Sequence, residues 1–228
     1  MSIAFIFPGQ GSQAPGMGKS LHDAFGAARE VFQEVDEALG EKLSRLIFEG
    51  PEDTLTLTAN AQPALMAVSL AAMRTLEREF GAPVTKAAFV AGHSLGEYSA
   101  LAAAGALSLS DAAKLLRIRG DAMQAAVPVG EGAMAALIGK VDVALAEDIA
   151  KAGESAGVVV VANDNNVGNV VISGSKAGID AALDYAKEKG ARAILLNVSA
   201  PFHSPLMQPA ADAMAEALAA AAIAPFAP

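Results

Sequence analysis

The feature that most constrains this chain is a strand-turn-helix pattern over residues 87–105, AAFVAGHSLGEYSALAAAG. Residues 88–91 form a short apolar run typical of a buried strand, and the Ala-rich segment after the turn is typical of a helix. Between them, Gly92 and Gly96 flank Ser94 in a G-x-S-x-G motif. In this context the motif indicates a nucleophile elbow, a sharp turn that holds the serine hydroxyl clear of the sheet at a helix N-terminus. The pattern therefore predicts an α/β fold with Ser94 as a nucleophile.

The composition excludes several other classes of protein. The chain contains no cysteine, which excludes disulfides, thiolate zinc sites and a cysteine nucleophile. Its net charge is −9, with acidic and basic residues interspersed, which argues against a nucleic-acid-binding surface. It has no apolar run of about eighteen residues that would cross a membrane, and its N-terminus lacks the basic region of a signal peptide. We therefore expect a cytoplasmic protein without nucleic-acid or membrane partners.

Two segments near the N-terminus resemble nucleotide-binding motifs, but neither fits. The glycine-rich turn at residues 9–14 follows an apolar strand at residues 3–7, as in a dinucleotide-binding fingerprint. The chain after it predicts helices only, so no second strand carries a ribose-binding acid. Residues 18–20 resemble the end of a phosphate-binding loop, but the glycine required earlier is replaced by Gln13. What remains is a glycine-rich turn that carries Gln10 and Gln13.

The rest of the first half predicts helices, which together with the two strands indicate a hydrolase-like parallel sheet body. Apolar residues recur at helical spacing over residues 21–39 and again to residue 48, and residues 62–80 predict one long helix. After the elbow, Ser110 and Asp111 form an N-cap signal for a helix that continues to residue 126.

From residue 132 the pattern becomes that of a ferredoxin-like subdomain, with the element order β-α-β-β-α-β. The turn-rich segment Asn163–Asn166 is expected to join the two middle strands. The expected strands are residues 133–139, 158–162, 170–173 and 192–199, and the expected helices are residues 141–152 and 176–189. We therefore assign residues 128–198 to an inserted subdomain, and residues 1–127 with 199–228 to the body.

A serine nucleophile needs a general base, and the chain has three histidines. His93 adjoins Ser94, so its side chain leaves the backbone in another direction and favours a packing role. His22 lies in the first amphipathic helix, where a solvated or capping role is expected. His203 lies in a proline-constrained loop before the last helix, where catalytic groups are commonly mounted. Elimination favours His203 as the base; the alternative is a loop histidine that caps local backbone.

Four segments, taken in order, resemble those of a known family. They are FPGQGSQ at the start, GHSLGEYSAL at the elbow, RIRGDAMQ after it and SAPFHSPLM near the end. Together they are similar to malonyl-CoA:acyl carrier protein transacylases of fatty acid synthesis and to the related acyltransferase domains of polyketide synthases, over the whole chain. The resemblance implies transfer of a malonyl group from malonyl-CoA to the phosphopantetheine thiol of acyl carrier protein. It implies no metal and no permanently bound cofactor.

The resemblance also implies roles for single residues. It makes Ser94 the nucleophile and His203 its base, and it places the malonyl carboxylate on Arg119. Spacing alone leaves Arg117 and Arg119 equal, and a solvated helix face is the alternative for either.

The implied oxyanion hole consists of the backbone N–H groups of Gln10 and Leu95, which fits the geometry of an elbow. Phe202 resembles the aromatic residue that limits α-branched acyl groups. Asn163 and Asn165 are weaker candidates for substrate contact, since asparagines that simply form a turn explain them equally well.

Two further functions stay open at this point. A serine esterase would need a third, acidic member of the site. The aspartates available for it lie in the inserted subdomain: Asp142, Asp148, Asp164, Asp180 and Asp184. A non-catalytic carrier-protein-binding fragment is the other possibility, because no strand follows the final helix, which Ser204 as N-cap and Pro205 predict to continue to residue 222. In the family, a backbone carbonyl beyond that helix orients the histidine. We therefore expect slow acylation of Ser94 and a tendency to self-associate.

Overall fold

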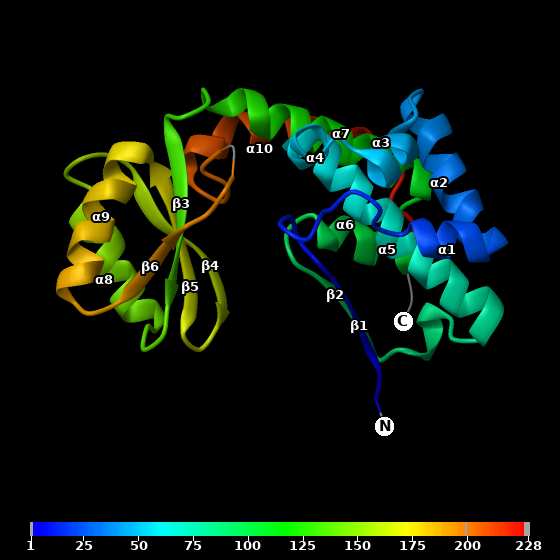
Figure 1. The fold of residues 1–228 in the computed structure, drawn as a ribbon, viewed down its shortest axis with the longest axis horizontal. Coiled ribbons are helices and arrows are strands. Elements are labelled where there is room, and N and C mark those ends of the chain that lie inside the picture. The colour runs from blue at the N-terminus through cyan, green and yellow to red at the C-terminus, as the bar shows by residue number, and fades with distance from the viewer. Residues whose placement is uncertain (1, 199, 226–228) are drawn as a thin grey trace. The chain divides into compact units, whose positions relative to one another are not determined.

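The computed structural model describes residues 2–198 and 200–225. The chain is a mixed α/β protein (Figure 1), as predicted. Packing divides it into two compact units. Unit 1 comprises residues 1–121 and 214–228, and unit 2 comprises residues 122–213.

The sheet described in unit 1 is a parallel pair of short strands. Strand β1 (Ala4–Phe7) lies beside strand β2 (Phe89–Gly92), with Phe7 in register with Gly92. Side chains of a strand alternate between its two faces. Phe7 is buried in the core, whereas Ile6 and Phe89 are exposed. The parallel arrangement is therefore confirmed, but the prediction that residues 88–91 form a buried strand is wrong: the residues of β2 are exposed or half-buried, because only one face of the pair packs into the core.

Helices form most of the core of unit 1. They are α1 (Lys19–Ala24), α2 (Gly26–Leu39), α3 (Leu43–Glu49), α4 (Glu52–Thr56) and the long helix α5 (Thr58–Phe80). Helix α5 begins ahead of the predicted start at Gln62, and it holds Pro63 within its second turn. The proline removes only the hydrogen bond to the carbonyl of Ala59. Because the helix starts early, Thr58 and Gln62 lie one turn apart on its buried side.

After the elbow come α6 (Gly96–Ala103) and α7 (Leu109–Ala126), the second of which continues into unit 2. The residue that caps α7 is Ser108. Its hydroxyl accepts the N–H of Asp111 at 2.9 Å and donates to the carboxylate of Asp111 at 2.7 Å. This is a reciprocal capping pair, so the predicted N-cap at Ser110 is wrong. No helix in the described ranges is long and apolar enough to cross a membrane.

Unit 2 contains the ferredoxin-like sheet. Its elements are β3 (Gly132–Ile138), α8 (Val143–Gly153), β4 (Val159–Asn166), β5 (Asn169–Ser175), α9 (Lys176–Glu188) and β6 (Arg192–Leu195). The strand order is β4-β5-β3-β6 with antiparallel neighbours, which confirms the predicted supersecondary pattern. Strand β6 ends at Leu195, and Ser199, the predicted end of this strand, lies outside the described residues. The boundaries of the inserted subdomain at residues 128 and 198 stay a prediction.

The two faces of this sheet have different cores. Helices α8 and α9 cover one face (Figure 1), where Ala135 and Leu137 of β3 are buried. On the other face Met134 and Ala136 pack against the end of α7 and against Phe202. The alternation along β3 therefore places the loop that carries His203 on the face opposite α8 and α9.

The segment Asn163–Asn166 is the last part of strand β4, so the predicted turn is misplaced. The pairing of β4 with β5 shifts register between Val161 and Asn163 and again between Asp164 and Asn166. These irregularities accommodate polar residues that disfavour regular strand. The chain reverses at Val167 and Gly168, where Gly168 has a φ of 84°.

The final helix is also different from the prediction. A single 3-10 turn, η2 (Pro205–Met207), precedes α10 (Gln208–Ala220). Ser204 occupies the N-cap position with Pro205 at the start of η2, as predicted, but its hydroxyl donates to the carbonyl of Pro201 at 2.7 Å and makes no side-chain cap.

Candidate active site

Ser94 lies on the sharp turn between β2 and α6, with a φ of 54°. Within residues 2–198 and 200–225, His203 is the only other non-glycine residue with a positive φ, at 56°. Such a backbone conformation is costly for a residue with a side chain, and it is concentrated at functional sites. The structure thus gives the two predicted catalytic residues the same unusual conformation, one in unit 1 and one in unit 2.

Close backbone packing explains both glycines of the elbow. A Cβ at Gly92 would lie 2.0 Å from the backbone carbon of Gly96, inside the turn itself. A Cβ at Gly96 would lie 2.3 Å from the carbonyl oxygen of Phe7 at the end of β1. Only glycine at both positions allows strand, turn and helix to approach this closely.

The loop after β1 lies against the elbow, as an oxyanion hole requires. The backbone of Gly9 is so close to His93 that a Cβ there would lie 2.5 Å from its Nδ1 atom. The neighbouring residue Gln10 is held by its side chain, which donates to the hydroxyl of Thr58 at 3.3 Å. Within the described part of the chain, neither the Gln10 N–H nor the Leu95 N–H donates to a protein acceptor. Both groups are therefore available to an external oxygen.

Arg119 on α7 lies directly beside the candidate nucleophile. Its Nη2 donates to the Oγ of Ser94 at 3.0 Å, and its Nη1 donates to the Oε1 of Gln62 at 2.7 Å. Gln62 is only 1% exposed. Helix α7 reaches this position because Gly120 packs onto α5, where a Cβ would lie 2.5 Å from the Cα of Ala59.

The guanidinium of Arg119 is largely buried without an acidic partner. Burial lowers its pKa, and the nearby Tyr98 and Glu97 partly oppose that effect. No Asp or Glu in the described ranges forms an ion pair with it. The carbon at the centre of the guanidinium lies 5.8 Å from the centroid of the Tyr98 ring. A buried cation that lacks a counter-ion in the protein is suited to an anionic ligand.

Arg117, the alternative that spacing left open, is placed differently. It donates to the Oδ1 of Asn60 at 2.7 Å and forms an ion pair with Glu41. Its charge is therefore already paired within unit 1.

The three histidines lie in different parts of the structure and have different surroundings. His22 lies on α1 and packs with Phe32 and Phe48, with ring centroids 5.9 and 5.0 Å away. His93 is exposed beside the loop of Gly9. His203 lies in unit 2, in the loop between β6 and η2.

The weaker candidates lie in unit 2. Phe202 is buried with Met207 and Met134. Asn163 and Asn165 lie on strand β4, and the amide of Asn165 donates weakly to Asn169 at 3.4 Å. They are therefore strand residues rather than residues of the predicted loop.

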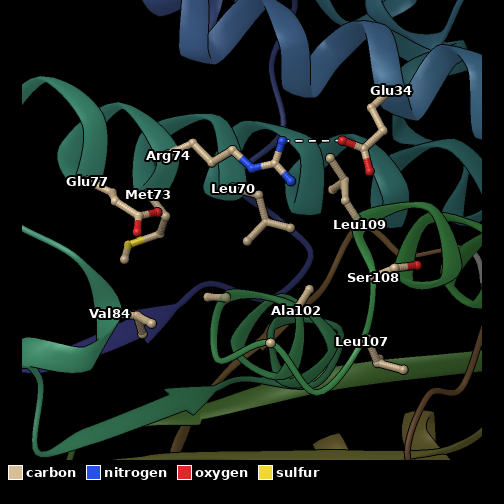
Figure 2. Close-up of a pocket in the computed structure, with 12 residues that line it drawn as sticks. Glu34, Leu70, Met73, Arg74, Glu77, Val84, Ala102, Leu107, Ser108 and Leu109 are labelled. Carbon is tan, nitrogen blue, oxygen red and sulfur yellow. Dashed lines mark hydrogen bonds and ion pairs between the residues drawn. The ribbon is translucent and has the colours of Figure 1, made fainter. Parts of the chain in front are cut away.

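Sequence reasoning missed Thr58, Gln62 and Tyr98. Thr58 and Gln62 lie near the elbow because α5 brings them there, and no local motif marks them. Tyr98 belongs to the segment GHSLGEYSAL, but nothing in that segment singled it out. A separate pocket of about 360 Å³ lies between α5 and the turn before α7 (Figure 2). The ion pair of Arg74 with Glu34 lies at this pocket, and none of the predicted site residues lines it.

The fold and the elbow define an α/β protein with a serine on a sharp strand-to-helix turn, and the sequence profile of the acyl transferase domain family matches residues 4–228. A protein named malonyl CoA-acyl carrier protein transacylase from Bacillus subtilis (strain 168) is 53% identical over 217 residues, which cover 95% of this chain and 67% of that protein. Its namesake from Escherichia coli (strain K12) is 45% identical over 219 residues, which cover 95% of this chain and 69% of the relative. The chain belongs to the acyl transferase family, within its malonyl CoA-acyl carrier protein transacylases.

Solved structures agree with this assignment. The acyl-carrier-protein S-malonyltransferase of Bartonella henselae superposes with a TM-score of 0.95 at 61% identity, covering 100% of this chain and 73% of the other. A malonyl-transacylase solved in complex with a type II PKS acyl-carrier protein has a TM-score of 0.93 at 41% identity, covering 98% of this chain and 72% of the other.

Proposed function

We propose that this protein transfers a malonyl group from malonyl-CoA to the phosphopantetheine thiol of acyl carrier protein, through a malonyl ester of Ser94, in fatty acid synthesis. The names of its relatives support the reaction, and the solved complex of a related transacylase with its carrier protein supports the acceptor. Both substrates dissolve in water, and we place the reaction in the cytoplasm.

The observation that carries the proposal is the position of Arg119. Its guanidinium lacks an acidic partner in the described protein and lies 3.0 Å from the Oγ that would carry the acyl group. In a malonyl ester two C–C bonds separate the carbonyl carbon from the carboxylate carbon, a span of about 2.5 Å. A carboxylate that close to the ester is within reach of Arg119, whereas an acetyl ester would leave the cation unmatched.

In the first half-reaction Ser94 attacks the thioester carbon. We assign His203 as the base that takes the hydroxyl proton while the Oγ–C bond forms. The negative charge on the carbonyl oxygen is stabilised by the N–H groups of Gln10 and Leu95, one from a neighbouring loop and one after the nucleophile. The C–S bond then breaks, and coenzyme A leaves as a thiol with the proton from His203.

In the second half-reaction the thiol of the carrier protein attacks the malonyl ester. His203 takes the thiol proton, the new C–S bond forms, and the C–O bond to Ser94 breaks with return of the proton to its hydroxyl. Serine, histidine and backbone amides supply every step, so the proposed reaction requires no metal and no permanently bound cofactor. We keep Phe202, Asn163 and Asn165 as candidate substrate contacts in unit 2.

The test is mass spectrometry of the protein after incubation with malonyl-CoA. We expect one malonyl adduct that maps to Ser94 and is absent from Ser94→Ala, and its loss when carrier protein is added. Transfer to water instead of carrier protein would indicate an esterase. No adduct at all, with carrier protein still bound, would indicate a non-catalytic binding protein.

A further inference from the structure

The contacts of Arg119 change when Ser94 is acylated. In the free protein the guanidinium donates, among the described residues, to the Oγ of Ser94 at 3.0 Å and to the Oε1 of Gln62 at 2.7 Å. In the acyl-enzyme the same Oγ becomes an ester oxygen, which is a poorer acceptor because its lone pair is delocalised. From that point Gln62 and the ring of Tyr98 are the protein contacts left to keep the guanidinium in place for the proposed malonyl carboxylate.

Tyr98 comes to Arg119 through the elbow itself. It lies in the first turn of α6, and its N–H donates to the carbonyl of Leu95 at 3.1 Å. It therefore moves with the nucleophile and the oxyanion donor as one rigid turn. Its ring centroid lies 5.8 Å from the guanidinium carbon of Arg119, within the range of a cation–π interaction.

The surroundings of this contact favour it. Tyr98 is partly buried, and burial raises the pKa of its phenol while the charge of Arg119 lowers it. Arg119 is largely buried as well, with water replaced by protein on most sides. A cation–π contact is stronger where both partners have lost water. Among the described residues, the acid whose charge acts on both groups is Glu97, which is exposed.

We propose that Tyr98 is a positioning residue for substrate charge: its ring holds the guanidinium of Arg119 in place beside the acylated serine, and so contributes to the choice of malonyl over uncharged acyl groups. The proposal rests on the proposed malonyl transfer. In this proposal the first turn of α6 has two functions: it orients Ser94, and through Tyr98 it orients Arg119, the residue that recognises the acyl group.

The test compares three replacements of Tyr98 by the ratio of kcat/KM for malonyl-CoA to kcat/KM for acetyl-CoA. Tyr98→Phe keeps the ring, and we expect a ratio within about twofold of the parent. Tyr98→Leu removes the ring, and we expect the ratio to fall by about 2- to 30-fold, mainly through KM for malonyl-CoA. Tyr185→Leu on α9 in unit 2 is the matched control and should keep the parent ratio.

A double-mutant cycle separates positioning from general packing. In an Arg119→Ala background, Tyr98→Leu should lower the ratio no further, because the cation that the ring holds is gone. An equal loss in both backgrounds, or an equal loss of malonyl and acetyl transfer, would overturn the proposal. A parent protein with no preference for malonyl would instead contradict the proposed function.

Fluorinated phenylalanines at position 98 keep the test decisive if Tyr98→Leu fails to fold. 3,5-difluorophenylalanine and 3,4,5-trifluorophenylalanine have nearly the shape of phenylalanine but progressively weaker negative charge on the ring face. We expect the malonyl-to-acetyl ratio to fall in the order of fluorine content. A ratio independent of fluorine content would show that the ring acts by shape alone and would overturn the proposal.

Discussion

Arg119 on α7 donates a hydrogen bond to the Oγ of Ser94 across 3.0 Å, although Ser94 lies on the turn before α6, 25 positions earlier in the chain. The contact joins a buried cation to the atom that is proposed to carry the acyl group. The proposed carboxylate-binding residue and the proposed nucleophile are thus in direct contact, and both lie within unit 1.

Replacement of Arg119 should remove the preference for malonyl groups. A hydrogen bond to a charged group contributes about 1.5–3 kcal/mol, so Arg119→Ala should lower kcat/KM for malonyl-CoA by about 10- to 150-fold and affect acetyl transfer much less. Arg119→Lys should be intermediate, because it keeps the charge but loses the planar fork. Arg117→Ala is the control: its partners are Asn60 and Glu41, so it should leave the ratio unchanged. The reverse result would assign the carboxylate to Arg117.

A carboxylate at position 62 should compete with the substrate. Gln62→Glu would place an acid where the Oε1 atom now lies 2.7 Å from Arg119, and an internal ion pair would occupy the guanidinium. We expect KM for malonyl-CoA to rise at least tenfold, with a smaller rise in Gln62→Leu. Gln33→Glu on the exposed side of α2 adds the same charge and is the control. Unchanged KM in Gln62→Glu would show that Gln62 does not orient Arg119.

A methyl group at Gly120 should force α5 and α7 apart. The added Cβ would lie 2.5 Å from the Cα of Ala59, and overpacking of this kind costs about 1–3 kcal/mol. Gly120→Ala should lower the free energy of unfolding by that amount and also reduce malonyl preference, because Arg119 is the adjacent residue. Gly26→Ala is the control, since the nearest atom there belongs to the Arg29 side chain at 3.7 Å. Equal urea midpoints for the two variants would contradict the close approach of the helices.

Tyr98 should make stability depend on alkaline pH. Burial raises its pKa in the folded protein above the unfolded value near 10, so the folded state keeps a proton that the unfolded chain releases. The contribution is fully present below pH 10 and is lost as pH rises through the folded pKa. Tyr98→Phe should therefore reduce the loss of stability above pH 10, measured by urea unfolding from pH 8 to 11. Tyr185→Phe, which removes the other tyrosine, is the control, and equal slopes for the two variants would contradict the burial of Tyr98.

Predictions from sequence succeeded where the deciding interactions are local. The elbow depends on two glycines and a serine within five positions, and the structure shows the close contacts that demand them. Predictions from sequence were wrong where a second residue or a tertiary contact competed with the local signal. Ser108 rather than Ser110 caps α7, because the helix begins at Leu109 and Ser110 already lies within its first turn. Asn163–Asn166 continues a strand, because pairing with β5 outweighs the preference of asparagine for turns.

The elbow, the ferredoxin-like order of strands and helices, and the family could all be inferred from the sequence alone. Each of these depends on residue types at short spacing or on motifs in a given order. Spacing left Arg117 and Arg119 equal and the resemblance favoured Arg119; the folded structure places Arg119 beside Ser94 and adds Gln62, Thr58 and Tyr98. These side chains come from α5, α6 and α7, and they meet because Gly120 lets two helices touch backbone to backbone. Contacts between distant segments depend on how helices pack, which periodicity along a single segment does not record.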